Sequence, residues 1–266
     1  MLYSDLGRDL FLIAGPCVIE SREHAFFMAA ELKHITAAAG VTFVFKASYD
    51  KANRSSIKSF RGIGMSEGLK ILADIREKFA IPVLSDVHEA SHCKPAGEVL
   101  DILQIPAFLS RQTDLLVAAA ETGKIVNVKK GQFLAPWEMK NVVEKIREAG
   151  NSQVLLTERG ASFGYNNLVV DFRSFPIMQS FGCPVIFDVT HSLQLPGAQG
   201  QSSGGQPQYI PHFARAGVAA GVDGLFMEVH DNPAKALSDG PNALQLSLLP
   251  AVLEEVVKIR KCLKKT

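Results

Sequence analysis

The feature that most constrains the fold is an alternation of short apolar runs with longer amphipathic stretches, repeated eight times along the chain. Runs rich in β-branched and aromatic residues indicate buried strands, and the longer stretches carry apolar side chains at helical spacing. The predicted strands are 10–15, 41–46, 82–87, 102–105, 125–129, 154–157, 185–189 and 224–229. The predicted helices are 22–39, 65–79, 91–99, 111–122, 137–149, 173–181, 210–219 and 244–261.

Strands that are apolar on both faces, each followed by a helix, are typical of a parallel sheet with covered faces. Eight such units over residues 1–266 predict one α/β domain, a single (β/α)₈ TIM barrel with a short N-terminal extension. A doubly wound open sheet is the alternative, although no GxGxxG motif follows the first strand. Glycines at 40, 123, 150 and 182 mark the ends of predicted helices.

Composition narrows the class of protein. With 28 Lys+Arg against 27 Asp+Glu, the net charge of +1 offers no field for nucleic acid or an anionic membrane. No apolar run reaches the roughly 18 residues that span a bilayer. The four cysteines are scattered without CxxC spacing, so we expect neither disulfides nor a zinc ribbon, and a cytoplasmic location. The long segment 192–208, with four glycines, is predicted to be a loop that serves as an active-site lid.

Active sites of barrels lie at the carboxyl ends of the strands, and there this sequence concentrates its polar residues. They are Cys17, Glu20, Lys46, Ser48, Asp50, Asp86, His88, Gln104, Lys129, Lys130, Glu158, Arg159, Asp188, His191, Glu228, His230 and Asp231. Within this set the cations Lys46, Lys129 and Arg159, joined by Lys51 and Arg54, favour a phosphorylated or carboxylated substrate. Two alternatives stay open: each cation is paired with a carboxylate, or Lys46 or Lys129 is a Schiff-base nucleophile.

A second group combines a thiol, an imidazole and carboxylates. Cys17, His191, Glu228 and either Asp231 or Asp239 offer the donors that suit Zn²⁺, Fe²⁺ or Mn²⁺. A buried free cysteine and a satisfied core histidine are the competing interpretation. That structural interpretation is the one adopted for the remaining residues of these types, His88, His230, Cys93 and Cys183.

Several stretches together resemble the 3-deoxy-D-manno-octulosonate 8-phosphate synthases, also called 2-dehydro-3-deoxyphosphooctonate aldolases. They are AGPCVIES at 14–21, KASYDKANRSS at 46–56, SDVHE at 85–89, NVKKGQ at 127–132, TERG at 157–160, DVTHS at 188–192 and SDGP at 238–241. The related heptulosonate synthases are similar too, but KANRSS at 51–56 is what the octulosonate enzymes are expected to carry. The resemblance covers nearly the whole chain.

The resemblance implies a reaction and a set of residue roles. Phosphoenolpyruvate would condense with arabinose 5-phosphate and release phosphate, on the route to the inner sugar of lipopolysaccharide, in a homotetramer without an organic cofactor. Cys17 places the chain in the metal-dependent group, with ligands Cys17, His191, Glu228 and Asp239. Lys46, Ser48, Lys51, Lys129, Gln132, Arg159 and His191 match the phosphoenolpyruvate side, and Asn53, Arg54, Gln201 and Ser203 the pentose phosphate side. Lys46, Lys129, His191 and Asp239 are the implied catalytic residues, and Arg111 would reach a neighbouring subunit's site.

Overall fold

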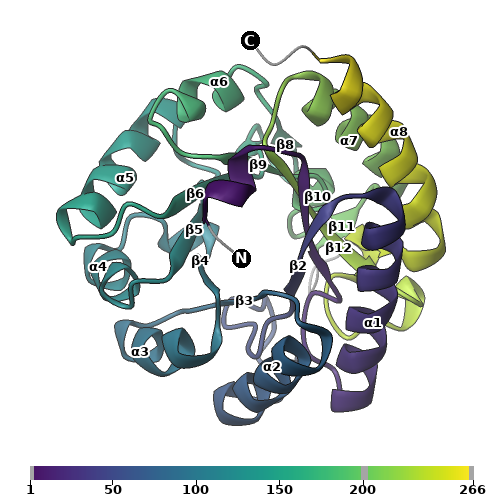
Figure 1. Cartoon of the computed structure of the whole chain (residues 1–266), viewed down its shortest axis with the longest axis horizontal. Coiled ribbons are helices and arrows are strands. Elements are labelled where there is room, and N and C mark those ends of the chain that lie inside the picture. The colour runs from purple at the N-terminus through teal and green to yellow at the C-terminus, as the bar shows by residue number, and fades with distance from the viewer. Residues whose placement is uncertain (1–2, 199–202, 264–266) are drawn as a thin grey trace.

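The fold is a closed parallel barrel surrounded by helices (Figure 1). A computed structural model describes residues 3–198 and 203–263. Neighbouring strands pair in the order β1-β2-β3-β4-β5-β6-β9-β12, and β12 pairs in parallel with β1 to close the ring. This closure confirms the (β/α)₈ barrel and excludes the open sheet. The barrel strands are β1 (Phe11–Gly15), β2 (Thr42–Lys46), β3 (Val83–Asp86), β4 (Ile102–Ile105), β5 (Ile125–Lys129), β6 (Val154–Glu158), β9 (Val185–Asp188) and β12 (Gly224–His230).

Eight helices form the outer ring among the described residues. They are α1 (Arg22–Ala39), α2 (Met65–Phe79), α3 (Ala90–Val99), α4 (Thr113–Glu121), α5 (Met139–Glu148), α6 (Ser174–Gln179), α7 (Ile210–Ala219) and α8 (Leu249–Cys262). The glycines predicted to end helices all have positive φ, the left-handed conformation typical of residues that follow a helix. No helix in the described ranges is both long and apolar enough to cross a membrane.

Two apolar clusters stabilise the barrel, one between strands and helices and one inside the ring. The inner cluster includes Phe11, Ile102 and Phe226, and it is completed by Leu6 of the 3₁₀ turn Tyr3–Gly7. The Tyr3 hydroxyl donates a hydrogen bond to the Val154 carbonyl, 2.7 Å away, at the start of β6. The predicted N-terminal extension therefore closes the amino-terminal end of the barrel and leaves the opposite end for a site (Figure 1).

The structure corrects the predicted helix over 244–261. Leu244–Gln245 instead forms a short strand, β13, that pairs with the end of β12, and α8 begins at Leu249. Pro250 explains the start, because proline lacks an amide donor and suits the first helical turn but not the interior. Smaller corrections shorten α4, α5 and α6 at both ends.

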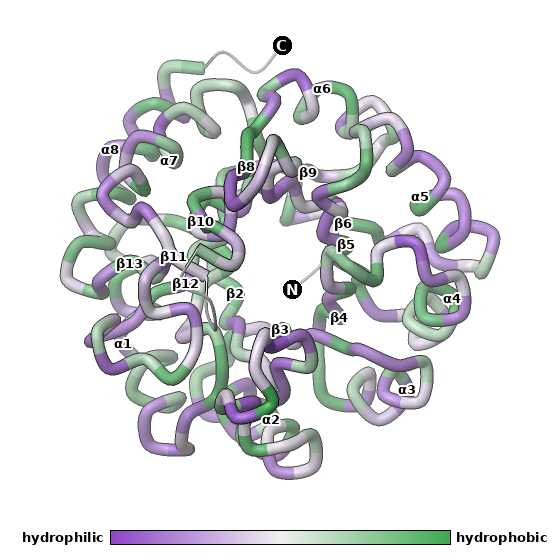
Figure 2. The backbone as a smooth tube through the Cα atoms, turned by 180° about the vertical axis from the view of Figure 1, so that it is seen from behind, coloured by the Kyte–Doolittle hydropathy of each residue, from purple (hydrophilic) through white to green (hydrophobic). Residues whose placement is uncertain are grey.

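Two short hairpins lie at the carboxyl end of the barrel. β7 (Ala161–Ser162) pairs with β8 (Leu168–Val169), and β10 (Gln194–Leu195) pairs with β11 (Gly204–Gly205). The segment 192–208 was expected to contain no strand, so that part of the expectation is wrong. Two-residue strands are too short to leave an alternating pattern in the sequence. Seen from behind, the loops with β8, β10 and β11 border the barrel opening (Figure 2).

Candidate active site

A polar cavity of about 260 Å³ opens at the carboxyl ends of the strands. Many of the predicted substrate-binding residues line it: Lys46, Lys51, Asn53, Arg54, Lys129, Gln132, Arg159, His191 and Ser203. Asp239, a predicted catalytic residue and metal ligand, lines it too. Ser48 is not part of the lining, because it is fully buried and donates a hydrogen bond to Asp86. Gln201 lies outside the described residues. Arg111 is exposed and does not line the cavity.

The close approach of β1 and β2 brings the first residues together. A Cβ atom on Gly15 would overlap the backbone carbonyl of Lys46, so only glycine allows this spacing. Cys17 then lies beside the end of β2, and its carbonyl accepts a hydrogen bond of 2.9 Å from Lys46 Nζ. Sequence and packing at the first two strands thus place a thiol next to a buried cation.

Two buried lysines have carboxylate neighbours. Lys129 Nζ lies 2.7 Å from Asp188 Oδ2 and 3.9 Å from the centre of the Phe226 ring. Lys46 Nζ lies 3.6 Å from Asp86 and 3.8 Å from Glu228. Burial lowers the pKa of Lys129 even though Asp188 acts in the opposite direction. The contacts of Lys46 and Lys129 therefore match the alternative in which each cation is paired with a carboxylate.

Arg159 differs from the lysines. One guanidinium nitrogen donates to the Gln194 side-chain oxygen at 2.7 Å, and a second, Nη1, is buried without a hydrogen-bond partner. Within the described ranges no carboxylate lies in ion-pair distance of Arg159. Burial lowers its pKa, yet a guanidinium stays charged at neutral pH. A buried charge with a free donor on a cavity wall is a binding position for an anion.

A chain of hydrogen bonds joins side chains of the neighbouring strands β6, β5, β4 and β3, and two of its members, Gln104 and Asp86, line the cavity. Thr157 donates to Asn127 at 2.7 Å, Asn127 donates to Gln104 at 2.9 Å, and Gln104 donates to Asp86 at 2.5 Å. Burial alone would raise the pKa of Asp86, but the charges of Lys46 and Lys51 hold it well below its usual range. Asp86 therefore stays ionised and fixes the adjacent lysine.

The candidate metal ligands converge at the same mouth. The donor atoms of Cys17, Glu228 and Asp239 all lie within 4.8 Å of one another, and Cys17 Sγ is 3.1 Å from Asp239. His191 Nε2 lies 3.5 Å from Glu228 Oε1, while its Nδ1 is 2.8 Å from Asp188. Both carboxylate oxygens of Glu228 are buried without a hydrogen-bond partner. A thiol, an imidazole and two carboxylates, one of which accepts no hydrogen bond, fit a borderline divalent cation. Asp188 would orient the His191 imidazole toward it.

Two of these residues have unusual backbones. Cys17 has φ of 61° and Asp239 has φ of 50°, in the left-handed region that non-glycine residues rarely adopt. Such conformations cluster at functional sites, where the surrounding structure holds them. Burial and the nearby Glu228 raise the pKa of the Cys17 thiol, so binding of a cation would have to release its proton. Asp231, the other acid considered for this group, lies elsewhere, against His24 and His230.

Sequence reasoning missed part of the cavity wall. His88 was interpreted as a core histidine, yet it lines the cavity, and its Nδ1 has no partner. Pro106, Ala107 and Phe108 also line it. Their position directly after β4 is the signal that could have found them, since every strand end faces the same mouth. Cys93 and Cys183 are buried free thiols, as expected.

Comparison with known proteins identifies a family and several close relatives of this chain. The model of the DAHP synthetase I family matches residues 5–265. A protein of Geobacter sp. (strain M21) is 62% identical over 253 residues, covering 95% of this chain and 93% of its own length. One from Bordetella petrii is 59% identical over 269 residues, covering 98% and 95%. One from Cyanothece sp. (strain PCC 7425) is 56% identical over 257 residues, covering 97% and 94%.

All three relatives are named 2-dehydro-3-deoxyphosphooctonate aldolase. Their names confirm the resemblance to the octulosonate synthases, and identity of this level over the full barrel means that the chain is an enzyme. It is a (β/α)₈ barrel with a cationic cavity and a thiol-containing donor set, and it belongs to the DAHP synthetase I family.

Proposed function

We propose that this enzyme condenses phosphoenolpyruvate with D-arabinose 5-phosphate to give 3-deoxy-D-manno-octulosonate 8-phosphate and inorganic phosphate. The product would enter synthesis of the lipopolysaccharide inner core, and the enzyme would act as a carbon–carbon bond-forming transferase in the cytoplasm. The observation that carries the proposal is the buried guanidinium of Arg159, which lines a cavity together with further cations and whose Nη1 has no hydrogen-bond partner. The name of the relatives, 2-dehydro-3-deoxyphosphooctonate aldolase, supports this proposal.

Phosphoenolpyruvate would lie on the β2, β5 and β6 side of the cavity. Lys129 and Arg159 would neutralise its phosphate, and Lys46 with Lys51 would hold its carboxylate. Lys51 Nζ lies 3.8 Å from both Glu228 and Asp239, so a substrate carboxylate would share this cation with the proposed metal ligands. Gln132 and His191, which line the cavity, complete the proposed contacts on this side, and Ser48 would act through its hydrogen bond to Asp86.

The pentose phosphate would lie toward the loop after β2 and the β10–β11 hairpin. Arg54 donates to the Ser238 hydroxyl at 2.8 Å and lies 3.9 Å from Asp239, and its Nε is buried without a partner. A sugar phosphate would satisfy that free donor. Asn53, Gln201 and Ser203 are the other proposed contacts, and Ser203 lines the cavity.

In the proposed reaction the methylene carbon of phosphoenolpyruvate attacks the aldehyde carbon of the pentose phosphate, and the aldehyde oxygen takes a proton. Water adds its hydroxyl to the other olefinic carbon. The resulting tetrahedral species loses phosphate by cleavage of its carbon–oxygen bond. No covalent intermediate with the enzyme is needed, so positioning and charge neutralisation by Lys46, Lys129 and Arg159 would supply most of the rate enhancement.

Cys17, His191, Glu228 and Asp239 would hold the divalent cation, Zn²⁺, Fe²⁺ or Mn²⁺. When bound, it would supply Lewis acidity to the aldehyde oxygen or to water. His191 and Asp239 also line the cavity, so both are proposed to act on substrate together with Lys46 and Lys129. No organic cofactor is part of the proposal.

The decisive experiment measures phosphate release from phosphoenolpyruvate with either arabinose 5-phosphate or erythrose 4-phosphate as the acceptor. We expect a kcat/KM at least about 100-fold higher with the pentose phosphate, because a matched phosphate site gains charged hydrogen bonds worth several kcal/mol. Preference for erythrose 4-phosphate would assign the chain to heptulosonate synthesis instead. Absence of phosphate release with both aldehydes would leave a binding protein and contradict the proposal.

A Schiff-base aldolase is the second candidate, favoured by one observation. The pKa of Lys129 is lowered by burial, which increases the neutral amine that a Schiff base requires. Borohydride treatment in the presence of substrate would trap a Schiff base on the chain. We expect no covalent adduct by mass spectrometry, because the Asp188 carboxylate 2.7 Å from Lys129 Nζ favours the charged ammonium.

A further inference from the structure

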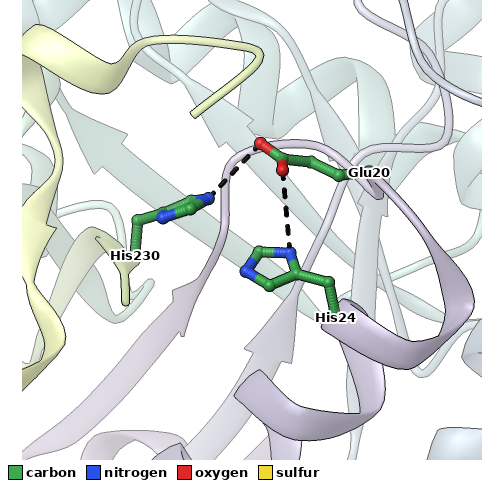
Figure 3. A group of neighbouring side chains, drawn as sticks. All are labelled: Glu20, His24 and His230. Atoms are coloured by element: carbon green, nitrogen blue, oxygen red, sulfur yellow. Dashed lines mark hydrogen bonds and ion pairs between the residues drawn. The ribbon is translucent and has the colours of Figure 1, made fainter. Parts of the chain in front are cut away.

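A second group of metal-ligating side chains lies outside the cavity. Glu20 follows β1, His24 is in the first turn of α1, and His230 is the last residue of β12. One ligand atom from each lies within 4.8 Å of the other two. Figure 3 shows the two imidazoles approaching the Glu20 carboxylate from different sides. None of the three lines the cavity.

The distances suit direct coordination. His230 Nε2 lies 3.3 Å from Glu20 Oε1, and His24 Nδ1 lies 4.0 Å from Glu20 Oε2 (Figure 3). Two atoms bound to one zinc ion at roughly 2.0–2.2 Å in tetrahedral geometry are about 3.3–3.6 Å apart. Only a small movement of His24 would therefore bring the three donors to bonding positions.

Asp231 supplies the outer contacts that metal-bound histidines need. Its Oδ1 lies 2.9 Å from His24 Nε2 and 3.1 Å from His230 Nδ1, the ring nitrogens that face away from Glu20. A carboxylate that accepts the second N–H of a histidine fixes the tautomer and directs the other nitrogen at a metal. One aspartate would do this for both rings.

The cluster is incomplete without a further partner. His24 Nδ1 is buried and has no hydrogen bond, which is unfavourable for a polar atom. The ring centres are 4.7 Å apart, and two carboxylates, Glu20 and Asp231, lie against the rings. A divalent cation among these side chains would offset the charge of the two carboxylates.

We propose that Glu20, His24 and His230 form a second divalent-cation site, separate from the Cys17 group, which takes a zinc-class ion. The two imidazoles and one carboxylate are a donor set typical of zinc, with water in the remaining position. In the metal-free chain the Asn232 amide donates to His230 Nδ1 at 2.9 Å. Binding of a cation at Nε2 would shift the single ring proton from Nε2 to Nδ1, where it would be donated to Asp231 in place of the hydrogen bond from Asn232.

A cation here would join two segments that carry the proposed catalytic metal ligands. Glu20 lies three residues after Cys17, and its Oε1 accepts a hydrogen bond of 2.7 Å from the Leu237 amide, two residues before Asp239. The second site would therefore have a structural role: it would hold the start of α1 against the loop after β12.

The test uses the full-length chain, stripped with a chelator, reloaded with zinc or cobalt, desalted and measured by elemental analysis. We expect His24→Gln and Glu20→Gln each to lose about one bound ion per chain relative to the parent. Glu20→Gln keeps an oxygen for the Leu237 amide. His34→Gln, at an exposed position of the same helix, is the matched control and should bind as much metal as the parent. With cobalt, the thiolate charge-transfer absorption reports the Cys17 group alone and should be unchanged in His24→Gln.

A second measurement does not depend on whether the variants fold. Diethyl pyrocarbonate modification of the parent, mapped by mass spectrometry, should show that zinc protects His24 and leaves His34 reactive. The proposal is overturned if both variants bind as much metal as the parent. It is equally overturned if zinc leaves the reactivity of His24 unchanged, which would make the cluster a set of hydrogen bonds only.

Discussion

At the scale of single residues, Arg159 is the sharpest test of the cavity. We expect Arg159→Ala to lower kcat/KM on the order of 100-fold, because a charged two-point contact to phosphate is lost where water is excluded. Arg173→Ala is the control, since Arg173 is exposed and pairs only with Asp171 among the described residues. Steady-state kinetics with matched unfolding curves checks both variants. Activity within a few-fold of the parent would make Arg159 a structural residue.

Cys17 carries the prediction about the metal. A strong chelator should abolish phosphate release by the parent, and a divalent transition metal should restore it. Cys17→Asn should retain part of the activity and become insensitive to chelator, because an amide supplies no thiolate but still hydrogen-bonds at the same point. Cys262→Ser, an exposed thiol, should respond like the parent. Full turnover by a parent chain that contains no metal would contradict the ligand assignment.

Much of the candidate active site could be predicted, because the charge of a side chain and the kind of metal donor it offers follow directly from the sequence. Lys129 is the last residue of β5 and Arg159 follows β6. The rule that the carboxyl ends of barrel strands face one mouth was enough to predict that these two residues lie in the same site. The rule could not separate Asp231 from Asp239, which are eight residues apart after the same strand. Only the left-handed backbone at Asp239 turns that carboxylate toward Cys17, while Asp231 lies against His24. Such a turn leaves no mark in residue type when the residue is not glycine.

At the scale of elements, the β10–β11 hairpin is held against the loop that carries Asp239. A Cβ atom on Gly205 would overlap the Asn242 side chain and the Pro241 carbonyl, whereas one on Gly204 would make ordinary contacts at 3.6 Å. We expect Gly205→Ala to lower kcat/KM about tenfold or more through displacement of that loop. Gly204→Ala should stay near the parent value. Equal kinetics of the two variants would show that this packing does not matter for the site.

The same hairpin is the predicted lid. Gln194, Pro196, Gly197 and Ser203 line the cavity, so the segment lies where closure would exclude water. We expect amide hydrogen exchange across 192–208 to slow when both substrates bind, while exchange in the barrel strands stays constant. Unchanged exchange in this segment would count against a gating role.

The N-terminal turn gives a pH prediction. Burial raises the pKa of Tyr3 to about 12 from an ordinary value of 10.0. Because the folded pKa is higher, the stabilising contribution of Tyr3 is complete below pH 10 and is lost as the pH rises toward 12. Chemical unfolding between pH 9 and about 12 should therefore show a steeper loss for the parent than for Tyr3→Phe. Tyr165→Phe, at an exposed position, should follow the parent. Parallel curves for the parent and Tyr3→Phe would contradict this.

Elements were predictable where they were long and bounded by glycine or proline. α1, α2 and α7 have the predicted bounds, because apolar spacing and caps such as Ser21 and Gly40 act locally. The short pairs β7–β8 and β10–β11 were not predictable. Both pairs are local hairpins, but a two-residue strand is too short to leave an alternating pattern in the sequence.

At the scale of the whole molecule, the proposed homotetramer has a specific surface to test. Phe133 and Trp137 follow β5, and Phe163 lies in the β7–β8 hairpin; all three are exposed. The Ser162 amide donates to the Gln132 carbonyl at 3.0 Å, so these segments adjoin. Exposed aromatic side chains on adjoining segments are candidates for a protein interface.

We expect a solution mass about four times 28.8 kDa by light scattering, and dissociation in Phe163→Asp. Phe27→Asp, on α1, should leave the mass unchanged.

Arg111 would be tested by mixing Arg111→Ala subunits with Arg159→Ala subunits. If Arg111 acts across subunits, hybrid tetramers should recover activity that neither variant has alone. A monomeric parent chain would refute the assembly.

The closure of the barrel between β1 and β12 has a consequence for synthesis on the ribosome. Cys17 follows β1, the first strand of the barrel, and Glu228 lies on β12, the last strand of the barrel. A nascent chain that ends before Gly224 already carries Lys46 and Lys129, yet β1 has no β12 to pair with, and half of the proposed metal ligands do not exist. Because these contacts join the extremes of the sequence, they form last. We therefore expect translation products that end before Asp239 to be inactive.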